Sequence, residues 1–437
     1  GAGNDTINGS FGDDDLSGGS GNDTITDDQG SNVLDGGEGN DTLRSQSLSG
    51  HHTLKGGSGA DNLSATGKIV VLEGGTENDN LNANGRLYTN GETSFVADGQ
   101  ATLDGGAGRD YIYVNDYNAS TISGGTGDDQ ISANHEPWDN NSDIKNSTTS
   151  ISGGEGNDYV NVSYHTTASL QGDAGDDQLY THKVQSSTLN GGSGSDQLSA
   201  YIHNYYTQQT SGDYTAAVQA VLDGGEGNDT LNISGTAYNY AGRVDVTANG
   251  GAGNDALVGN SGNNTIQGGA GDDLIFFSGG NDIVDGGSAT DILLIGSREA
   301  YGFSSEIGEA VPSFAIQPIA EGSSDNYVYF KIGSNQTRTQ NIETFEINGV
   351  AYDSDPSSNH YLGSNFETYD PAAVVLDDTD DTSSSDTQET TVTETQDDSE
   401  GATTEEATVQ EPFSDALDVN VVSKSGVALN QALGPLA

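Results

Sequence analysis

The 437-residue sequence contains no cysteine and no methionine, only one tryptophan and only 7 prolines. Without cysteine no disulfide can hold the fold, and bound metal is the usual substitute in a secreted protein. No run of apolar residues approaches the length of a membrane-spanning helix. Because the chain begins at Gly1 partway through a repeat, we expect it to be a piece of a longer protein.

Basic side chains are scarce. Lysine and arginine number 12 against 67 aspartate and glutamate residues, which gives a formal net charge of -55. A chain with this charge repels itself at neutral pH unless cations bind or the chain unfolds. This balance argues against nucleic acid and anionic membranes as partners, and it favours divalent cations. The apolar fraction of 31% argues against a large conventional hydrophobic core.

Glycine is plentiful, and its spacing is that of a nonapeptide rather than of a linker. Three of the copies are GGSGNDTIT (18–26), GGEGNDYVN (153–161) and GGAGDDLIF (268–276). The glycines allow positive φ angles, so the backbone carbonyls can turn inward. Aspartate adds a hard anionic oxygen, and Ca²⁺ binds six to eight oxygens at about 2.3–2.6 Å. The aliphatic residue at the eighth position is expected to point inward from a short strand.

This nonapeptide resembles the RTX (repeat-in-toxin) haemolysin-type calcium-binding repeat, over residues 1–294. The resemblance implies an all-β fold, a right-handed parallel β-roll or β-solenoid, in a secreted protein. It also implies that each Ca²⁺ lies between loops of successive turns, held by two aspartates and several carbonyls. Three copies depart from the pattern, and the departures put the neighbouring ions in doubt: a motif glycine is replaced by Glu77, Asp173 and Ala289.

The phase of the repeat separates two edges of the expected roll. Strong motifs begin at 18, 36, 56 and 74, about two nonapeptides apart, and a roll places two strands in each turn. The strong motifs should therefore share one edge, where the expected calcium ligands are Asp5, Asp23, Asp41, Asp61, Asp79, Asp110, Asp129, Asp158, Asp177, Asp196, Asp229, Asp255, Asp273 and Asp291. Fourteen turns at ~4.8 Å make a rod of roughly 65 Å. On the other edge we expect metal only near the ends, through Asp14 and Asp282, with Asn264 a weaker candidate.

The second edge also takes insertions, within residues 83–104, 133–152, 200–223 and 233–249. Insertions on one face of a repeat protein often build its binding surface. Tyrosine would supply contact area with a polar tip. Two interpretations stay open, namely contact with a partner (another copy or a cell-surface glycan or protein) and simple cover of the edge. The aromatic residues concerned are Tyr88, Phe95, Trp138, Tyr201, Tyr205, Tyr206, Tyr214, Tyr238 and Tyr240.

Three further segments follow the roll. Residues 295–353 contain alternating strand-like runs and resemble the β-rich cap of RTX rolls, although a separate small β domain would show the same pattern. Residues 354–411 contain no lysine or arginine and are expected to be a disordered acidic linker. Residues 412–437 turn apolar, and their position and composition are similar to the C-terminal signal of type I secretion. A docking segment is the alternative.

No catalytic constellation is evident. The seven histidines form no HExxH motif, no GxSxG is present, and the glycine-rich loops lack the lysine of a phosphate site. We therefore expect a non-enzymatic structural or cell-surface protein, of S-layer, matrix or adhesin type, that folds on extracellular calcium. The alternatives are the calcium-binding domain of a secreted protease, lipase or epimerase, and a carbohydrate-binding module.

Overall fold

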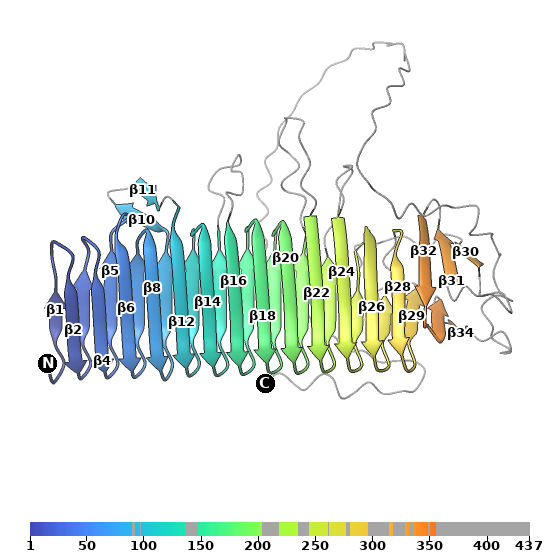
Figure 1. Cartoon of the computed structure of the whole chain (residues 1–437), viewed down its shortest axis with the longest axis horizontal. Coiled ribbons are helices and arrows are strands. Elements are labelled where there is room, and N and C mark those ends of the chain that lie inside the picture. The colour runs from blue at the N-terminus through green and yellow to red at the C-terminus, as the bar shows by residue number, and fades with distance from the viewer. Residues whose placement is uncertain are drawn as a thin grey trace, which may run out of the picture.

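The computed structural model describes residues 1–89, 92–96, 98–135, 147–202, 218–234, 244–260, 262–276, 280–295, 314–317, 328–332, 335–347 and 350–354. These residues form strands and connecting turns with no helix, so none of them belongs to a helix that could cross a membrane. Two 16-stranded sheets and one short hairpin account for all the strands. The strands stack in chain order along one long axis (Figure 1), so the repeats build a rod. The chain is thus an all-β solenoid of the β-roll type.

The sheet toward the viewer in Figure 1 is called the front sheet. Its strands, in spatial order, are β2 (Asp15–Ser20), β4 (Val33–Glu38), β6 (His51–Ser58), β8 (Ile69–Thr76), β12 (Gln100–Ala107), β14 (Ala119–Thr126), β16 (Thr148–Glu155), β18 (Thr167–Ala174), β20 (Ser186–Ser193), β22 (Val218–Glu226), β24 (Val244–Ala252), β26 (Asn263–Ala270), β28 (Ile283–Ser288), β32 (Asn335–Gln340), β31 (Val328–Ile332) and β30 (Phe314–Gln317).

The other sheet is called the back sheet. Its strands are β1 (Thr6–Asn8), β3 (Thr24–Asp27), β5 (Thr42–Gln46), β7 (Asn62–Thr66), β9 (Asn80–Asn84), β13 (Tyr111–Asn115), β15 (Gln130–Asn134), β17 (Tyr159–Ser163), β19 (Gln178–His182), β21 (Gln197–Tyr201), β23 (Thr230–Ser234), β25 (Ala256–Val258), β27 (Leu274–Phe276), β29 (Ile292–Ile295), β33 (Thr344–Ile347) and β34 (Val350–Asp353). The repeat thus supplies one strand to each sheet in every turn.

The core is a narrow layer between the two sheets. Alternate residues point inward, so β17 buries Val160 and Val162 while β16 buries Ile151. Register between turns is in step, because Ile151 pairs with Ile122 on one side and with Leu170 on the other. Columns of aliphatic side chains therefore run the length of the rod. This arrangement explains how a sequence with few apolar residues still builds a continuous core.

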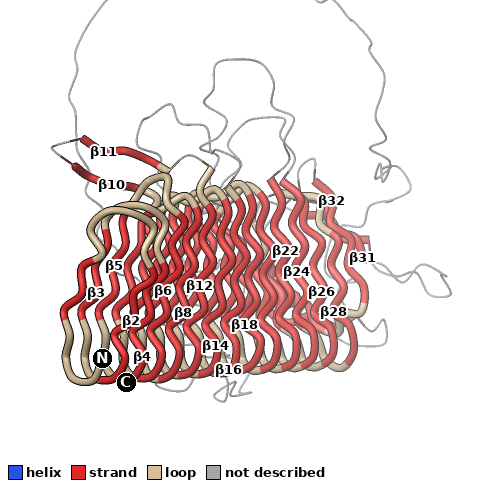
Figure 2. Tube along the Cα trace, turned by 60° about the vertical axis from the view of Figure 1, so that its left-hand side comes forward, coloured by secondary structure: helices blue, strands red, loops and turns tan. Residues whose placement is uncertain are grey.

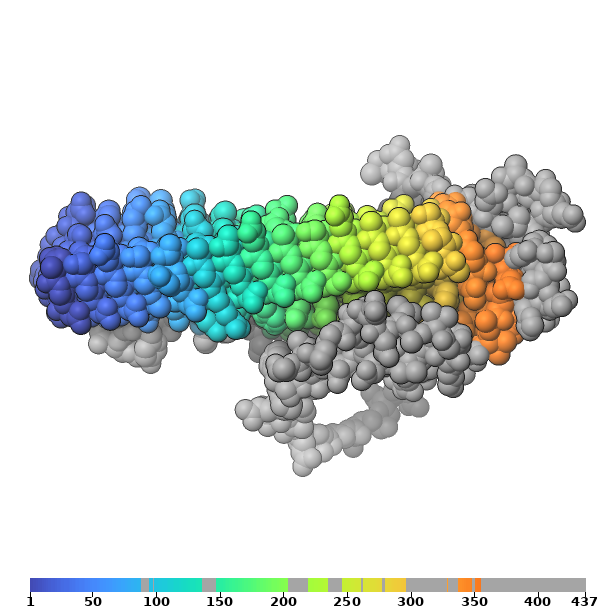
Figure 3. All heavy atoms as spheres, turned by 90° about the horizontal axis from the view of Figure 1, so that it is seen from below, coloured from blue at the N-terminus to red at the C-terminus, as the bar shows by residue number. Residues whose placement is uncertain are grey.

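The two long edges of the rod differ. At the motif edge each front strand passes through its GGxGxD loop into the next back strand, as β16 does into β17. The motif edge lies along the bottom of Figure 1, and Figure 3 views the rod from that side. At the opposite edge, called the insertion edge, back strands return to the front sheet. Figure 2 shows the stacked turns in an oblique view.

At the C-terminal end the strand direction changes. β32 and β33 still pair in parallel with β28 and β29, whereas β31, β30 and β34 then add antiparallel strands. Antiparallel strands do not repeat the roll connection, so the solenoid stops here. The rest of the predicted linker and tail, residues 355–437, lies outside the described residues.

The insertions are described only in part. Between β9 and β12 the chain forms the antiparallel hairpin of β10 (Arg86–Thr89) and β11 (Glu92–Phe95), above the insertion edge in Figure 1. Tyr201 was expected in an inserted loop, but it belongs to the back strand β21, because the regular register continues to that residue. The remaining loop aromatics lie outside the described residues: Trp138, Tyr205, Tyr206, Tyr214, Tyr238 and Tyr240.

Candidate metal-binding columns

The motif aspartates form one column along the motif edge. In each pair of successive turns, the backbone N–H of one motif aspartate donates to Oδ1 of the next, as Asp158 does to Asp177 at 2.8 Å. The same bond recurs at 2.7–2.9 Å along the entire series Asp5, Asp23, Asp41, Asp61, Asp79, Asp110, Asp129, Asp158, Asp177, Asp196, Asp229, Asp255, Asp273 and Asp291. The fourteen motif-edge candidates are therefore brought together in sequence order.

The second oxygen of each carboxylate has a different environment. Oδ2 is buried and accepts no hydrogen bond in thirteen of these aspartates, from Asp23 to Asp291. It faces the first glycine of its own loop and the corresponding carbonyl of the next turn. A Cβ built on Gly153 would collide with Oδ2 of Asp158 and lie 2.9 Å from the carbonyl oxygen of Gly172. A buried anionic oxygen and a carbonyl oxygen thus share a space that only glycine leaves open.

Burial controls the charge of this column. Removal from water raises the pKa of Asp129, Asp158 and Asp177 to about 7, although the N–H bond from the preceding turn acts in the opposite direction. Neighbouring carboxylates raise these pKa values further, as Asp177 does for Asp158. Isolated buried carboxylates are costly to ionise. A cation among these oxygens would remove that cost.

The loop backbone explains the glycines. Gly154, the second residue of its motif, has φ of +117°, and its Cβ would overlap the carbonyl oxygen of Gly125 in the preceding turn. Where another residue replaces a motif glycine, the loop keeps the same form, because φ is +73° at Glu77, +77° at Asp173 and +102° at Ala289. The N–H to Oδ1 bonds continue through these turns. The three departures leave the column uninterrupted.

A second ladder, which the sequence did not lead us to expect, runs through the residue before the motif aspartate wherever that residue is Asn or Asp. Oδ1 of Asn157 accepts the N–H of Asp176 at 2.8 Å, and Oδ1 of Asp176 accepts the N–H of Ser195 at 2.8 Å. These bonds run from later turn to earlier turn, opposite to those of the aspartate column. The recurring Asn or Asp at the fifth motif position was the available signal. The hydrogen bonds of this second ladder join the backbones of successive loops, on the outer side of the buried carboxylates.

The donor set suits calcium. Among the described residues no three His, Cys, Asp or Glu side chains converge on a point, so backbone carbonyls must supply most ligands of any ion. Carboxylate and carbonyl oxygens are the hard ligands that Ca²⁺ prefers, whereas Zn²⁺ sites use nitrogen and sulfur. The unpartnered buried Oδ2 atoms and the inward carbonyls therefore fit Ca²⁺.

The column ends in the C-terminal strands at a residue that the motif search could not find. Oε2 of Glu343 accepts the N–H of Asp291 at 2.8 Å, as the next aspartate would. The carbonyl of Asn341 faces Gly286, where the next motif glycine carbonyl would lie. The five residues before Glu343 include no glycine, so the motif is absent there and the sequence did not indicate this role.

The insertion edge holds acidic residues near its N-terminal end. Asp14 lies here, and its Oδ2 is buried without a partner, as is Oδ2 of Asp27. A Cβ on Gly9 would lie 3.0 Å from Oδ2 of Asp14 and would collide with Oδ2 of Asp27, so both oxygens face one space. The interaction with the nearby side chain of Asp27 is the main cause that raises the pKa of Asp14, and burial adds to it. Asp27 was missed, although it stands five residues before Asn32, where the motif would begin with glycine.

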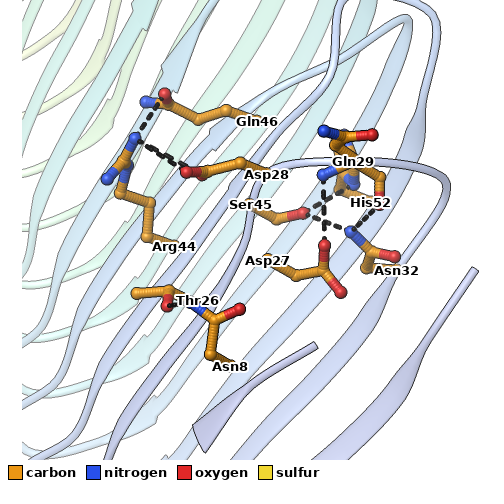
Figure 4. A network of polar contacts seen from close by, with 10 residues as sticks. All are labelled: Asn8, Thr26, Asp27, Asp28, Gln29, Asn32, Arg44, Ser45, Gln46 and His52. Carbon is orange, nitrogen blue, oxygen red and sulfur yellow. Dashed lines mark hydrogen bonds and ion pairs between the residues drawn. The ribbon is translucent and has the colours of Figure 1, made fainter. Parts of the chain in front are cut away.

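A polar network closes that end of the insertion edge (Figure 4). Asn32 takes the motif aspartate position, and its amide donates to Oγ of Ser45 at 3.1 Å. Ser45 in turn bonds Nδ1 of His52 at 2.8 Å. His52 holds the equivalent position in the next turn, with Val70 after it, so carboxylates give way to an imidazole and then to an aliphatic side chain. Burial lowers the pKa of His52, which favours the neutral ring.

At the C-terminal end of the same edge, Asp282 is paired with Asn264. The backbone N–H and the side-chain amide of Asn264 both donate to Oδ1 of Asp282 at 2.8 Å. Burial raises the pKa of Asp282 to about 7. The N–H of Asp282 bonds Oγ1 of Thr337, so a strand of the C-terminal segment also closes this column. The two predicted residues thus meet, with one carboxylate and one amide.

Comparison with protein families matches the chain to the RTX calcium-binding nonapeptide repeat (4 copies). The match falls on nine segments, residues 1–25, 17–46, 55–85, 97–116, 118–135, 150–162, 221–232, 249–284 and 278–293. No curated protein matches the chain. The matched segments contain twelve of the fourteen aspartates of the motif-edge column, and Asp177 and Asp196 lie in the stretch between two of these segments.

Proposed function

We propose that the chain is an extracellular structural protein that folds on calcium. RTX calcium-binding repeats match nine segments between residues 1 and 293, and such repeats bind calcium in proteins that are typically secreted. The role is mechanical rather than enzymatic, at a cell surface or in a matrix. The single observation that carries this proposal is the column of buried Oδ2 atoms that lack a partner.

In the proposed mechanism the aspartates and glycine carbonyls of successive loops hold the ions. Bound Ca²⁺ supplies positive charge between carboxylates that would otherwise repel one another. The carboxylates of successive turns would hold an ion between them, at the same turn-to-turn junctions that the N–H to Oδ1 bonds already join. The glycines keep the carbonyls directed inward.

Charge makes the process a switch. With a net charge of -55 and little apolar surface, the chain without calcium is expected to stay extended. Extracellular calcium modules typically bind at about 10⁻⁴–10⁻³ M. Because many sites fill together and only the folded chain offers them, mass action can stabilise the fold by several kcal/mol. The protein would thus remain unfolded in a calcium-poor cytosol and fold outside.

The test is a calcium titration followed by sedimentation velocity and far-UV circular dichroism. The native chain should compact and gain β-structure at about 10⁻⁴–10⁻³ M Ca²⁺. The double variant Asp158→Ala/Asp177→Ala should need a several-fold higher concentration, because two adjacent carboxylates of the column are lost. Asp35→Ala/Asp104→Ala removes the same charge from exposed sites of the front sheet and should titrate like the native chain. An unchanged curve for the first variant would refute the ion assignment.

A further inference from the structure

The outward face of the back sheet has a composition unlike that of the rest of the molecule. Over β7, β9, β13, β15, β17, β19, β21 and β23, the outward positions carry only Asn, Gln, Ser, Thr, Tyr and one histidine, His182. We call this the neutral face. In a chain with 67 acidic residues, the described strands of this face hold no outward acidic side chain.

The front sheet provides the contrast. One outward column of its strands contains Asp35, Glu73, Asp104, Asp223 and Asp285, with Lys55 the only cation among them. The motif edge carries the aspartate column and further acids beside it. Acids therefore recur on the outward side of the front sheet, whereas the outward positions of the eight strands of the neutral face hold none, although both sheets come from the same repeat.

Aromatic and amide side chains form rows on the neutral face. The rings of Tyr159 and Tyr180 lie 5.5 Å apart in adjacent turns, and those of His182 and Tyr201 are stacked at 4.9 Å. The hydroxyl of Tyr180 bonds the side-chain oxygens of Gln178 and Gln197. His182 and Tyr201 turn their flat surfaces toward each other, and the rings of Tyr159 and Tyr180 meet at a tilt of 39°. The ring surface used in these contacts is not open to a sugar, which disfavours sugar stacking.

We propose that the neutral face is where a second copy of this chain docks, face to face, in the calcium-loaded state. This inference rests on the proposed function, because only the calcium-folded rod has the face. Two rods of net charge -55 repel each other through every acidic surface, and the described neutral face is where they can approach without opposing carboxylates. Tyrosine is enriched at such interfaces, and a two-fold pairing lets the same patch meet itself.

The size of the face supports a modest interaction. Eight strands at ~4.8 Å spacing, each of five residues at ~3.3 Å, cover roughly 600 Å². Two such faces bury roughly 1,200 Å² in total, the lower limit for specific interfaces. We therefore expect reversible association that grows with concentration rather than a permanent dimer.

The experiment is sedimentation velocity of the full chain in millimolar calcium over a range of protein concentrations. The native protein should associate. The variant Asn161→Asp/Gln178→Glu places two near-isosteric acids on the neutral face and should shift association to at least about tenfold higher concentration, since like charges would meet across the interface. The control Gln171→Glu/Asn190→Asp adds the same charge to the front sheet in neighbouring turns and should associate like the native chain.

The possible failures can be told apart. Compaction with calcium but no association of the native chain would overturn this inference and leave the proposed function standing. Absence of compaction would overturn both. Equal weakening by the two variants would mean a general charge effect and would also overturn the docking site. Retention of a monomeric native rod on insoluble neutral polysaccharide, lost only in the Asn161→Asp/Gln178→Glu variant, would assign the face to glycan instead.

Discussion

Each motif aspartate performs two tasks with its two oxygens. Oδ1 of Asp177 accepts a backbone N–H from the preceding turn, and Oδ2 stays buried beside the glycines. Asparagine could perform the first task, as Asn32 does for the N–H of Asp14 at 3.1 Å. It could not supply the negative charge of the second. Aspartate is therefore required where an ion binds, and asparagine suffices where the column only has to hold its backbone.

Gly154→Ala tests the loop geometry. Its φ of +117° and the overlap of the new methyl group with the carbonyl of Gly125 should reduce stability in calcium by about 1–3 kcal/mol. The measurement is urea unfolding at saturating calcium. Ser150→Ala, on an exposed outward site of the same strand, should change little. Equal stability of the two variants would mean that this loop relaxes freely.

At the scale of elements, the C-terminal strands complete the columns with side chains of their own. Glu343 receives the N–H of Asp291 and Thr337 receives that of Asp282. The last turn of the roll would otherwise leave those backbone groups unpaired at an open end. The strands β32 and β33 therefore close the solenoid both by sheet pairing and by substituting for the next motif.

Glu343→Ala should destabilise this end more than the middle. Loss of a charged acceptor for a backbone N–H typically costs about 1–3 kcal/mol. Hydrogen exchange should speed up at the amides of β28 and β29 while those of β17 and β19 stay protected. Glu155→Ala, which removes an exposed acid from the middle of the rod, serves as control. Uniform acceleration along the rod would contradict a local closing role.

Most of the strands could be predicted from the sequence. A period of 18 residues with inward aliphatic side chains such as Leu34 and Leu72 places two strands in each turn and stacks equivalent strands of successive turns. The positions of Glu343 and Asp27 could not. Glu343 reaches its place through pairing of β33 with β29, a contact that no motif encodes. Asp27 replaces a glycine on the edge where the repeat is weak. Their roles depend on which turns become neighbours in the fold. Insertions of variable length make these neighbours hard to identify in the sequence.

At the scale of the whole molecule, the buried column makes the calcium-free fold sensitive to pH. The pKa of Asp158 is about 7 in the fold, while an unfolded aspartate titrates near 3.9. Between these values the folded chain binds more protons than the unfolded chain, so its stability rises as pH falls. This contribution of the protonated aspartates to the stability of the calcium-free fold is lost as pH rises through about 7.

In excess chelator, therefore, lowering the pH from 8 to 5 should increase β-structure and compaction. In millimolar calcium the same change should have little effect, because bound ions keep the carboxylates ionised in the fold, as they already are in the unfolded chain at pH 5. Circular dichroism and sedimentation velocity at each pH would decide. Equal pH dependence with and without calcium would mean that the motif column is not the group that titrates.

The direction of the aspartate hydrogen bonds has a consequence for assembly. Each turn donates its N–H to a carboxylate of the turn that follows it in the sequence, from Asp5 through to Asp273. A turn joining the N-terminal side of a growing rod meets an acceptor already in position, whereas one joining the C-terminal side must bring its own. For the oppositely directed bonds of the Asn and Asp ladder, the ready acceptor lies on the C-terminal side instead. The two ends of a growing rod should therefore differ in which contact positions the next turn, the aspartate column at one end and the Asn and Asp ladder at the other.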